Sequence, residues 1–308
     1  MEIIGGDYEH TLEFGPPDQT GVFYDRRPIA ECFKAVLTRG EFEASEFSLA
    51  NYIIYRCSGD DWLTAVPVFP SRVFRHSYVV VRKGSPLQSF SQLTGKTIGV
   101  MDYSQTAAVW LRGLFLEECG VHWRDINWVS SKVQRFGAPE GVKLTTTERD
   151  IEELLIAGEL DAAMLFPPKD FRKHEADRAL RTLLPDARAA EKEYFRRTHV
   201  FPIMHTVVVR KEAATAEARA LTRIFHAYSE AKKKALTRKL GMTFLPWSDG
   251  VWAEVLENFD GDSHPYGLTA SNCRVIELLI DYLNEQGFIS TRPSVASLFP
   301  KETSDWVE

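Results

Sequence analysis

The sequence lacks the features that mark several large classes of protein. No apolar run approaches the ~20 residues of a membrane-spanning helix, so we expect no membrane partner. A Gly-rich phosphate loop, a GxGxxG turn and a GxSxG elbow are all missing, which argues against common nucleotide sites and serine hydrolases. Positive charge is not in excess, because the net charge is −6, so we expect no nucleic-acid partner.

Cysteine pairs and metal-ligand spacings are also missing. The four cysteines are scattered, and the first ten residues have neither the basic nor the apolar segment of a secretory signal. Scattered thiols without such a signal predict a cytoplasmic protein. No HxH, HExxH or HxxxH occurs, so we expect no metal. His76, His205 and His264 could still meet in space with Glu46 or Asp262, which spacing alone does not decide.

What is present is the composition of a globular α/β protein. The chain has 308 residues, 44% of them hydrophobic and 26% charged, which suits two domains of ordinary size. Helical and strand patterns alternate along it, as in layered α/β folds. Ser48 is placed to cap a helix and Gly120 to end one. Pro67 breaks a strand-like run, which is therefore expected at a sheet edge or as an irregular segment. Residues 137–147 show no pattern and are expected to be a loop.

One phrase occurs twice, about 130 residues apart. "HSYVVVRK" begins at His76 and "HTVVVRK" at His205, each after a basic and aromatic lead-in. We interpret both as strands that cross between two lobes, although a run of valines typical of a β-strand also recurs by chance. The predicted first lobe is discontinuous, 1–81 plus 207–308, with 82–206 inserted as the second lobe. Two crossing strands would make a hinge and a central cleft.

Three groups of polar residues converge on such a cleft. They are Arg72, Arg75 and His76 before one strand; Tyr103, Ser104, Gln105 and Thr106 at a strand-to-helix turn; and Tyr194, Arg196, Arg197, His199 and His205 before the other strand. The turn offers backbone N–H groups and hydroxyls to an anion. Surface charges, structural histidines and an ordinary capped helix are the alternatives. Their clustering favours a small anionic, aromatic ligand.

At these residues the sequence resembles the 4,5-dihydroxyphthalate decarboxylase family, whose fold is that of the type II periplasmic binding proteins. The matching stretches keep the family order: "SEFSLANYI" (45–53), "PVFPSRVFRHS" (67–77), "LTGKTIGVMDYSQTAAVWLRG" (93–113), "AGELDA" (157–162), "YFRRTHVFPIMHTVVVR" (194–210) and "PYGL" (265–268). The resemblance implies a two-lobed α/β architecture and loss of CO₂ from a hydroxylated aromatic acid without a cofactor. Where the family often has an arginine before its double proline, Leu165 and Phe166 precede Pro167 here, which points to a different aromatic acid or one with a single carboxylate.

A direct loss of CO₂ would leave an unstable aryl anion, so the expected reaction begins with protonation of the carbon that bears the carboxylate. His76 or His205 is the expected proton donor, because histidine titrates near neutral pH. Arginine side chains, whose guanidinium groups form two parallel hydrogen bonds, would hold the substrate carboxylates. The remaining candidates are Arg72, Arg75 and Arg196 or Arg197 for the carboxylates, Ser48, Ser104, Gln105 and Thr106 for the anion seat, Tyr103 for the ring, and Glu46, His264 or Tyr266 for the phenol proton.

Two other functions stay open from the sequence. A solute-binding or sensor protein for a small aromatic carboxylate would use the same cleft without chemistry, and fold alone does not separate the two. A metal-dependent decarboxylase is the second alternative, although ligand spacing does not favour it. The sequence also leaves homo-oligomerisation open.

Overall fold

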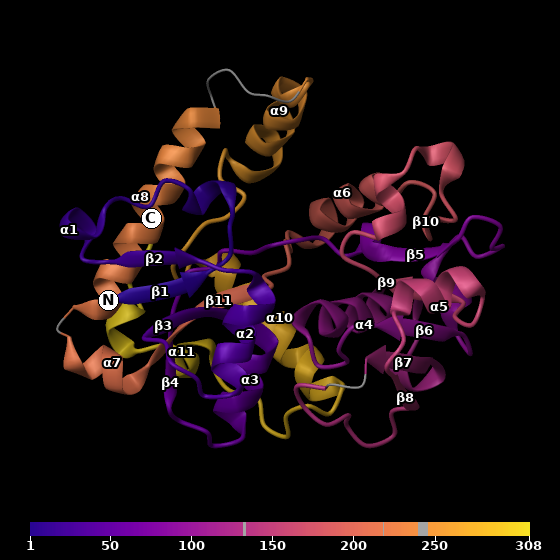
Figure 1. The fold of residues 1–308 in the computed structure, drawn as a ribbon, viewed down its shortest axis with the longest axis horizontal. Coiled ribbons are helices and arrows are strands. Elements are labelled where there is room, and N and C mark those ends of the chain that lie inside the picture. Colours follow the sequence, from indigo (N-terminus) through magenta and orange to yellow (C-terminus); the bar gives the residue numbers. More distant parts are fainter. Residues whose placement is uncertain (132–133, 218, 240–245) are drawn as a thin grey trace. The chain divides into compact units, whose positions relative to one another are not determined.

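The computed structural model describes residues 1–131, 134–217, 219–239 and 246–308. The chain forms two compact units (Figure 1). The first contains Met1–Arg72, Ile203–Glu277 and Pro293–Glu308, and the second contains Val73–Pro202 and Leu278–Arg292. Within the described residues, no helix is both long enough and apolar enough to cross a membrane.

The first unit is built on a five-stranded mixed sheet with the order β2-β1-β3-β11-β4. Its strands are β1 (Glu2–Gly5), β2 (Phe23–Arg26), β3 (Ala44–Ser48), β4 (Leu63–Val66) and β11 (His205–Arg210). Strands β1, β2 and β3 run parallel, whereas β11 lies antiparallel between β3 and β4. The run Val207–Val209 is buried without a break, as expected of a strand covered on both faces. Strand β4 lies at the sheet edge, as Pro67 predicts.

Helices surround this sheet. They are α1 (Pro17–Thr20), α2 (Ile29–Leu37), α3 (Leu49–Cys57), α7 (Lys211–Ala216), α8 (Ala220–Lys239), α9 (Ser248–Phe259) and α11 (Val295–Leu298), with short 3-10 helices at Glu9–Thr11 and Lys301–Thr303. Ser48 caps α3 as predicted, because its side chain accepts a hydrogen bond from the N–H of Asn51 at 3.4 Å. This cap joins the carboxyl end of β3 directly to a helix.

The second unit has a six-stranded sheet with the order β10-β5-β9-β6-β7-β8. Its elements are β5 (Val79–Arg82), β6 (Thr97–Val100), β7 (Asn127–Ser131), β8 (Leu144–Thr147), β9 (Ala162–Met164), β10 (Leu180–Thr182), α4 (Thr106–Cys119), α5 (Ile151–Ala157), α6 (Ala187–Thr198) and 3-10 helices at His76–Tyr78, Phe90–Leu93, Trp123–Asp125, Lys169–Arg172 and Glu175–Asp177. Gly120 ends α4 in the left-handed conformation, with φ of 65°. Strand β8 lies where a loop was expected, because its polar residues at the sheet edge show no apolar alternation.

The unit bounds differ from the expected lobe bounds. Strand β5 pairs with β9 and β10 of the second sheet, so residues 73–81 belong to the second unit. The doubled phrase therefore forms one strand in each sheet. The connecting segments are hydrogen-bonded to each other instead, through a bridge between Arg72 and Ile203.

A third difference concerns the C-terminal helix α10 (Ala270–Glu285). Its last turns belong to the second unit rather than the first. The Arg112 Nε donates to Gln286 Oε1 at 2.7 Å, and Gly113 packs against the Tyr282 ring, where a Cβ would not fit. The absence of a side chain at Gly113 thus lets this helix approach α4.

Candidate functional site

A buried carboxyl group organises one edge of the first sheet. Glu46 of β3 has no exposed surface, and its Oε1 lies 2.6 Å from His205 Nδ1 and 2.7 Å from the Tyr8 hydroxyl. Its Oε2 accepts a hydrogen bond from the N–H of Gly6 at 2.9 Å. The register of β3 and β11 brings Glu46 and His205 together. Glu46 of β3 pairs with Val207 of β11, so it is a diagonal neighbour of His205, two residues before Val207.

His205 is held in one orientation by these neighbours. A carboxylate oxygen only accepts, so Nδ1 of His205 carries the proton in this contact and Nε2 is the opposite nitrogen of the ring. The side chain is 18% exposed, and its ring meets that of Phe33 edge-on at 5.0 Å between centroids. Glu46 therefore orients the imidazole. With all its close contacts already made, Glu46 does not suit the expected role of phenol base.

A second histidine, His10, continues this cluster, and the sequence patterns did not single it out. It lies in the 3-10 helix Glu9–Thr11, and its ring stacks on Tyr8 at 5.1 Å with an interplanar angle of 9°. On its other side, the His264 ring centroid lies 5.8 Å away. Burial lowers the pKa of His10 and lowers that of His264 well below its usual value, the latter with a further contribution from Arg72. Both rings are therefore neutral at neutral pH.

The loop that carries His264 is fixed by Lys232 of α8. The buried ammonium donates to Asp262 Oδ2 at 2.6 Å, to the His264 carbonyl at 2.8 Å and to Glu308 Oε2. Asp262 Oδ1 in turn accepts from the N–H of His264 at 2.8 Å. A buried charge is tolerated only when its hydrogen bonds are made, and here the three ammonium N–H groups meet three acceptors.

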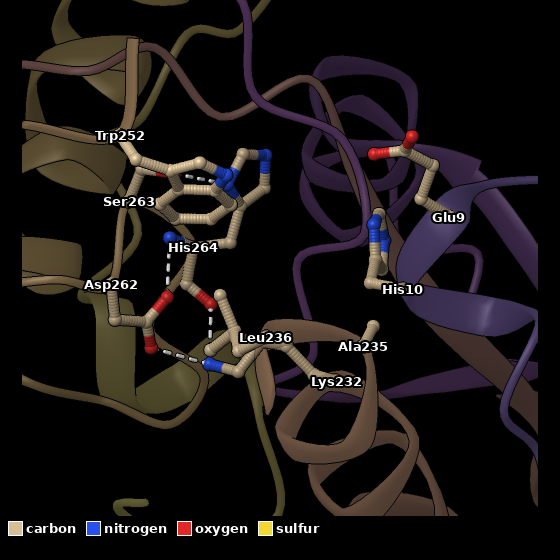
Figure 2. Close-up of a pocket in the computed structure, with 9 residues that line it drawn as sticks. All are labelled: Glu9, His10, Lys232, Ala235, Leu236, Trp252, Asp262, Ser263 and His264. Carbon is tan, nitrogen blue, oxygen red and sulfur yellow. Dashed lines mark hydrogen bonds and ion pairs between the residues drawn. The ribbon is translucent and has the colours of Figure 1, made fainter. Parts of the chain in front are cut away.

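These residues border a cavity of about 150 Å³. In Figure 2, His10 lies on one side, and His264 and Trp252 lie on the other. Lys232 and Leu236 of α8 also contribute to its wall. The predicted residue His264 and the unpredicted residue His10 thus face the same space.

Arg72 belongs to the same unit and is also buried. It donates to Asn272 Oδ1 and, at 3.1 Å, to the Pro265 carbonyl. Burial lowers the pKa of its guanidinium to about 10, so it stays positively charged at neutral pH. Tyr266 follows Pro265 in the chain. Its side chain lies in the hydrophobic core, and burial raises its pKa well above the usual value. Tyr266 therefore does not suit its expected role as a proton acceptor.

In the second unit, His76 and Arg75 lie in buried aromatic surroundings. His76 is 1% exposed, and neither ring nitrogen has a hydrogen-bond partner among the described residues. Burial, together with the charge of Arg197, lowers its pKa to about 4. The guanidinium of Arg75 lies 4.9 Å from the ring centroids of both Tyr78 and Phe166, and burial lowers its pKa to about 10.

The anion-binding site expected at the turn before α4 already contains the carboxyl group of Asp102. Asp102 Oδ1 accepts from both the N–H and the hydroxyl of Ser104, each at 2.7 Å. Asp102 Oδ2 accepts from the N–H of Arg135 at 2.9 Å. An external anion would therefore compete with Asp102 for these donors. Gln105 occupies the N-cap position of α4 without a side-chain capping bond.

The other predicted binding residues are scattered. Thr106 is buried in the first turn of α4, and the Tyr103 ring packs 3.8 Å from the Arg112 guanidinium. Arg196 is 74% exposed and pairs with Glu193 of its own helix. Arg197 is half-exposed and pairs with Glu118.

No group of three His, Cys, Asp or Glu side chains converges as metal ligands do within residues 1–131, 134–217, 219–239 and 246–308. The convergence found in the first unit instead combines carboxyl, imidazole, phenol and guanidinium groups. Such a set suits proton transfer to and from a small anion.

Comparison with known proteins defines the class first. A model of the family described as "ABC transporter, phosphonate, periplasmic substrate-binding protein" matches residues 33–249. The solved structure of the periplasmic aliphatic sulphonate binding protein SsuA from Escherichia coli has a TM-score of 0.58 at 14% identity, over 97% of this chain and 91% of that one. The solved structure of the desulfurization enzyme DSZB has a TM-score of 0.54 at 12% identity, over 97% of this chain and 96% of that one. The chain thus has the two-lobed α/β fold of the periplasmic binding proteins and belongs to this family.

Sequence similarity gives a narrower assignment. A 4,5-dihydroxyphthalate decarboxylase from Comamonas testosteroni is 32% identical over 292 residues, which covers 90% of this chain and 88% of the relative. A second protein of that name, from Pseudomonas putida, is 36% identical over 44% of this chain and 56% of its own length. The chain belongs to the 4,5-dihydroxyphthalate decarboxylase family.

Proposed function

We propose that this protein removes CO₂ from a hydroxylated aromatic carboxylic acid, with no cofactor. The observation that carries the proposal is the contact between His205 and the buried Glu46, beside His10, His264 and Arg72 in one unit of the fold. Similarity to the Comamonas testosteroni decarboxylase over nine-tenths of the chain supports the reaction class.

The chemistry requires an acid that protonates the ring carbon bearing the carboxylate. A ring hydroxyl supplies electrons to that carbon, and the resulting dienone-like intermediate loses CO₂ as the C–C bond electrons return to the ring. The hydroxyl proton must be accepted when the intermediate forms and returned when aromaticity is restored. Such positioned proton transfers typically contribute ~10²–10⁴-fold in rate.

We assign the proton donor to His205. Glu46 holds Nδ1, so the imidazolium form of His205 carries its second proton on Nε2, delivers it to the ring carbon and returns to the neutral form. His76 is the less suitable donor, because a pKa of about 4 leaves it neutral at neutral pH and because its ring is 1% exposed. Arg72 supplies the positive charge that holds the substrate carboxylate.

The test is release of CO₂ from a panel of hydroxylated phthalates and benzoates by the purified protein, with and without a chelator. We expect stoichiometric CO₂ and the matching phenol, at a rate that the chelator does not change. No CO₂ from any member of the panel contradicts the proposal, and loss of activity with the chelator supports a metal-dependent reaction.

A second candidate function follows from the fold. Binding proteins such as SsuA from Escherichia coli share the architecture, so a non-catalytic receptor for a small aromatic carboxylate is the alternative. Tight binding of panel members without any CO₂ release supports that function. The His205 imidazole beside the Glu46 carboxyl group and the neighbouring rings of His10 and His264 favour catalysis, because anion binding alone needs no proton donor.

A further inference from the structure

His10, which lines the pocket shown in Figure 2, has a buried ring nitrogen without a hydrogen-bond partner. In the part of the chain that the structure describes, nothing is hydrogen-bonded to Nε2 of His10. A neutral imidazole carries one N–H group and one nitrogen lone pair. With the proton on Nδ1, the lone pair of the neutral ring lies on Nε2.

The surroundings keep this acceptor in place. Stacking on Tyr8 fixes the plane of the His10 ring, and Tyr8 is itself fixed by its hydrogen bond to Glu46. Burial disfavours the imidazolium form of His10, so its ring stays neutral at neutral pH. A buried acceptor without a donor costs free energy. A ligand that brings an O–H group to this nitrogen removes that cost.

The rest of the pocket has the properties of a site for a flat ring. Its volume is about 150 Å³, a size at which an apolar cavity accommodates a benzene molecule. Trp252, Ala235 and Leu236 supply apolar surface. The ammonium of Lys232 is occupied by Asp262, Glu308 and the His264 carbonyl, so it has no donor left for a ligand anion.

We propose that His10 is a specificity-determining residue, whose Nε2 accepts a hydrogen bond from a ring hydroxyl of the aromatic acid. The hydroxyl-bearing edge of the ring lies in this pocket beside Trp252 and Leu236. The inference rests on the proposed function for the class of ligand. It adds a residue that distinguishes a hydroxylated ring from one whose oxygen is methylated.

The test uses two ligands that cannot lose CO₂, 4-hydroxybenzenesulfonate and 4-methoxybenzenesulfonate, with binding measured by calorimetry. Methylation keeps the oxygen but removes the donor. We expect the native protein to bind the hydroxyl compound at least about tenfold more tightly. In His10→Phe, which keeps a ring to stack on Tyr8, the ratio of the two affinities should fall to about one. His10→Gln, which restores an acceptor, should recover part of the ratio.

His174→Phe is the matched control, because His174 is exposed in the other unit, and it should keep the native ratio. Thermal unfolding of each variant shows whether it is folded. Equal affinities for the two sulfonates in the native protein, or binding of neither, overturn the inference without any variant. A native preference that persists in His10→Phe also overturns it. A preference that follows His10 in a protein that releases no CO₂ supports the inference and contradicts the proposed function.

Discussion

Nδ1 of His205 lies 2.6 Å from Oε1 of Glu46, and the two residues lie on neighbouring antiparallel strands. Replacement of Glu46 by Gln keeps the size of the side chain but replaces a pure acceptor by an amide, which holds the imidazole less well. We expect the turnover number to fall by at least ~10²-fold with a smaller change in KM. Steady-state kinetics on the substrate found in the CO₂ panel measure this.

Glu41→Gln is the control for that substitution, because Glu41 is exposed in the same unit and should leave turnover unchanged. The ¹⁵N resonances of the His205 ring report whether the tautomer is lost in Glu46→Gln. Native turnover with an altered tautomer would remove Glu46 from the mechanism.

His76 should make the stability of the protein depend on pH. Its pKa is about 4 in the folded state and near 6.5 when unfolded, so between these values the unfolded chain binds a proton that the folded chain does not. Stability therefore falls as pH decreases from about 6.5 to about 4, by a total of about 3 kcal/mol from this residue. Urea unfolding of His76→Phe at several pH values should show a correspondingly weaker dependence.

His174→Phe serves as the control for His76, since an exposed histidine contributes little to the pH dependence. Catalysis provides a second measurement, because His76→Phe should keep turnover within severalfold if His205 is the donor. A loss of ~10²-fold or more would return the donor role to His76.

Lys232 should contribute to stability through the loop that it holds. Lys232→Met leaves Asp262 and Glu308 without their buried cation, and removal of one partner of such a group costs about 3 kcal/mol. The neighbouring Lys233 is exposed on the same helix, so Lys233→Met should change stability by less than about 0.5 kcal/mol. Equal midpoints of urea unfolding for the two variants would show that the cluster adds nothing.

Arg72 and Arg196 should behave differently although the sequence placed both in one carboxylate clamp. Arg72→Lys keeps the charge but loses the planar guanidinium that Asn272 and Pro265 hold in place and that we propose for the substrate carboxylate. We therefore expect KM to rise by about tenfold or more. Arg196→Ala removes an exposed ion pair and should change neither KM nor stability measurably. An increase in KM for Arg196→Ala alone would reverse the assignment.

The local structure of this protein could be predicted wherever a short stretch carries its own physical reason. Ser48 caps α3, Gly120 ends α4, and Pro67 lies beside an edge strand, because each depends on backbone geometry within a few residues. Strand β8 was missed because an exposed edge strand needs no apolar pattern.

The family and the two-lobed α/β class also followed from the sequence, since long quoted stretches keep their order. Tertiary structure alone decided which polar residues meet. His10 meets His264 because the loop between α9 and α10 packs against the 3-10 helix Glu9–Thr11. Asp102 occupies the donors that were expected to bind a substrate anion. Hydrogen-bond partners far apart in the chain depend on how the sheets and helices pack, and no local pattern of residues records that packing.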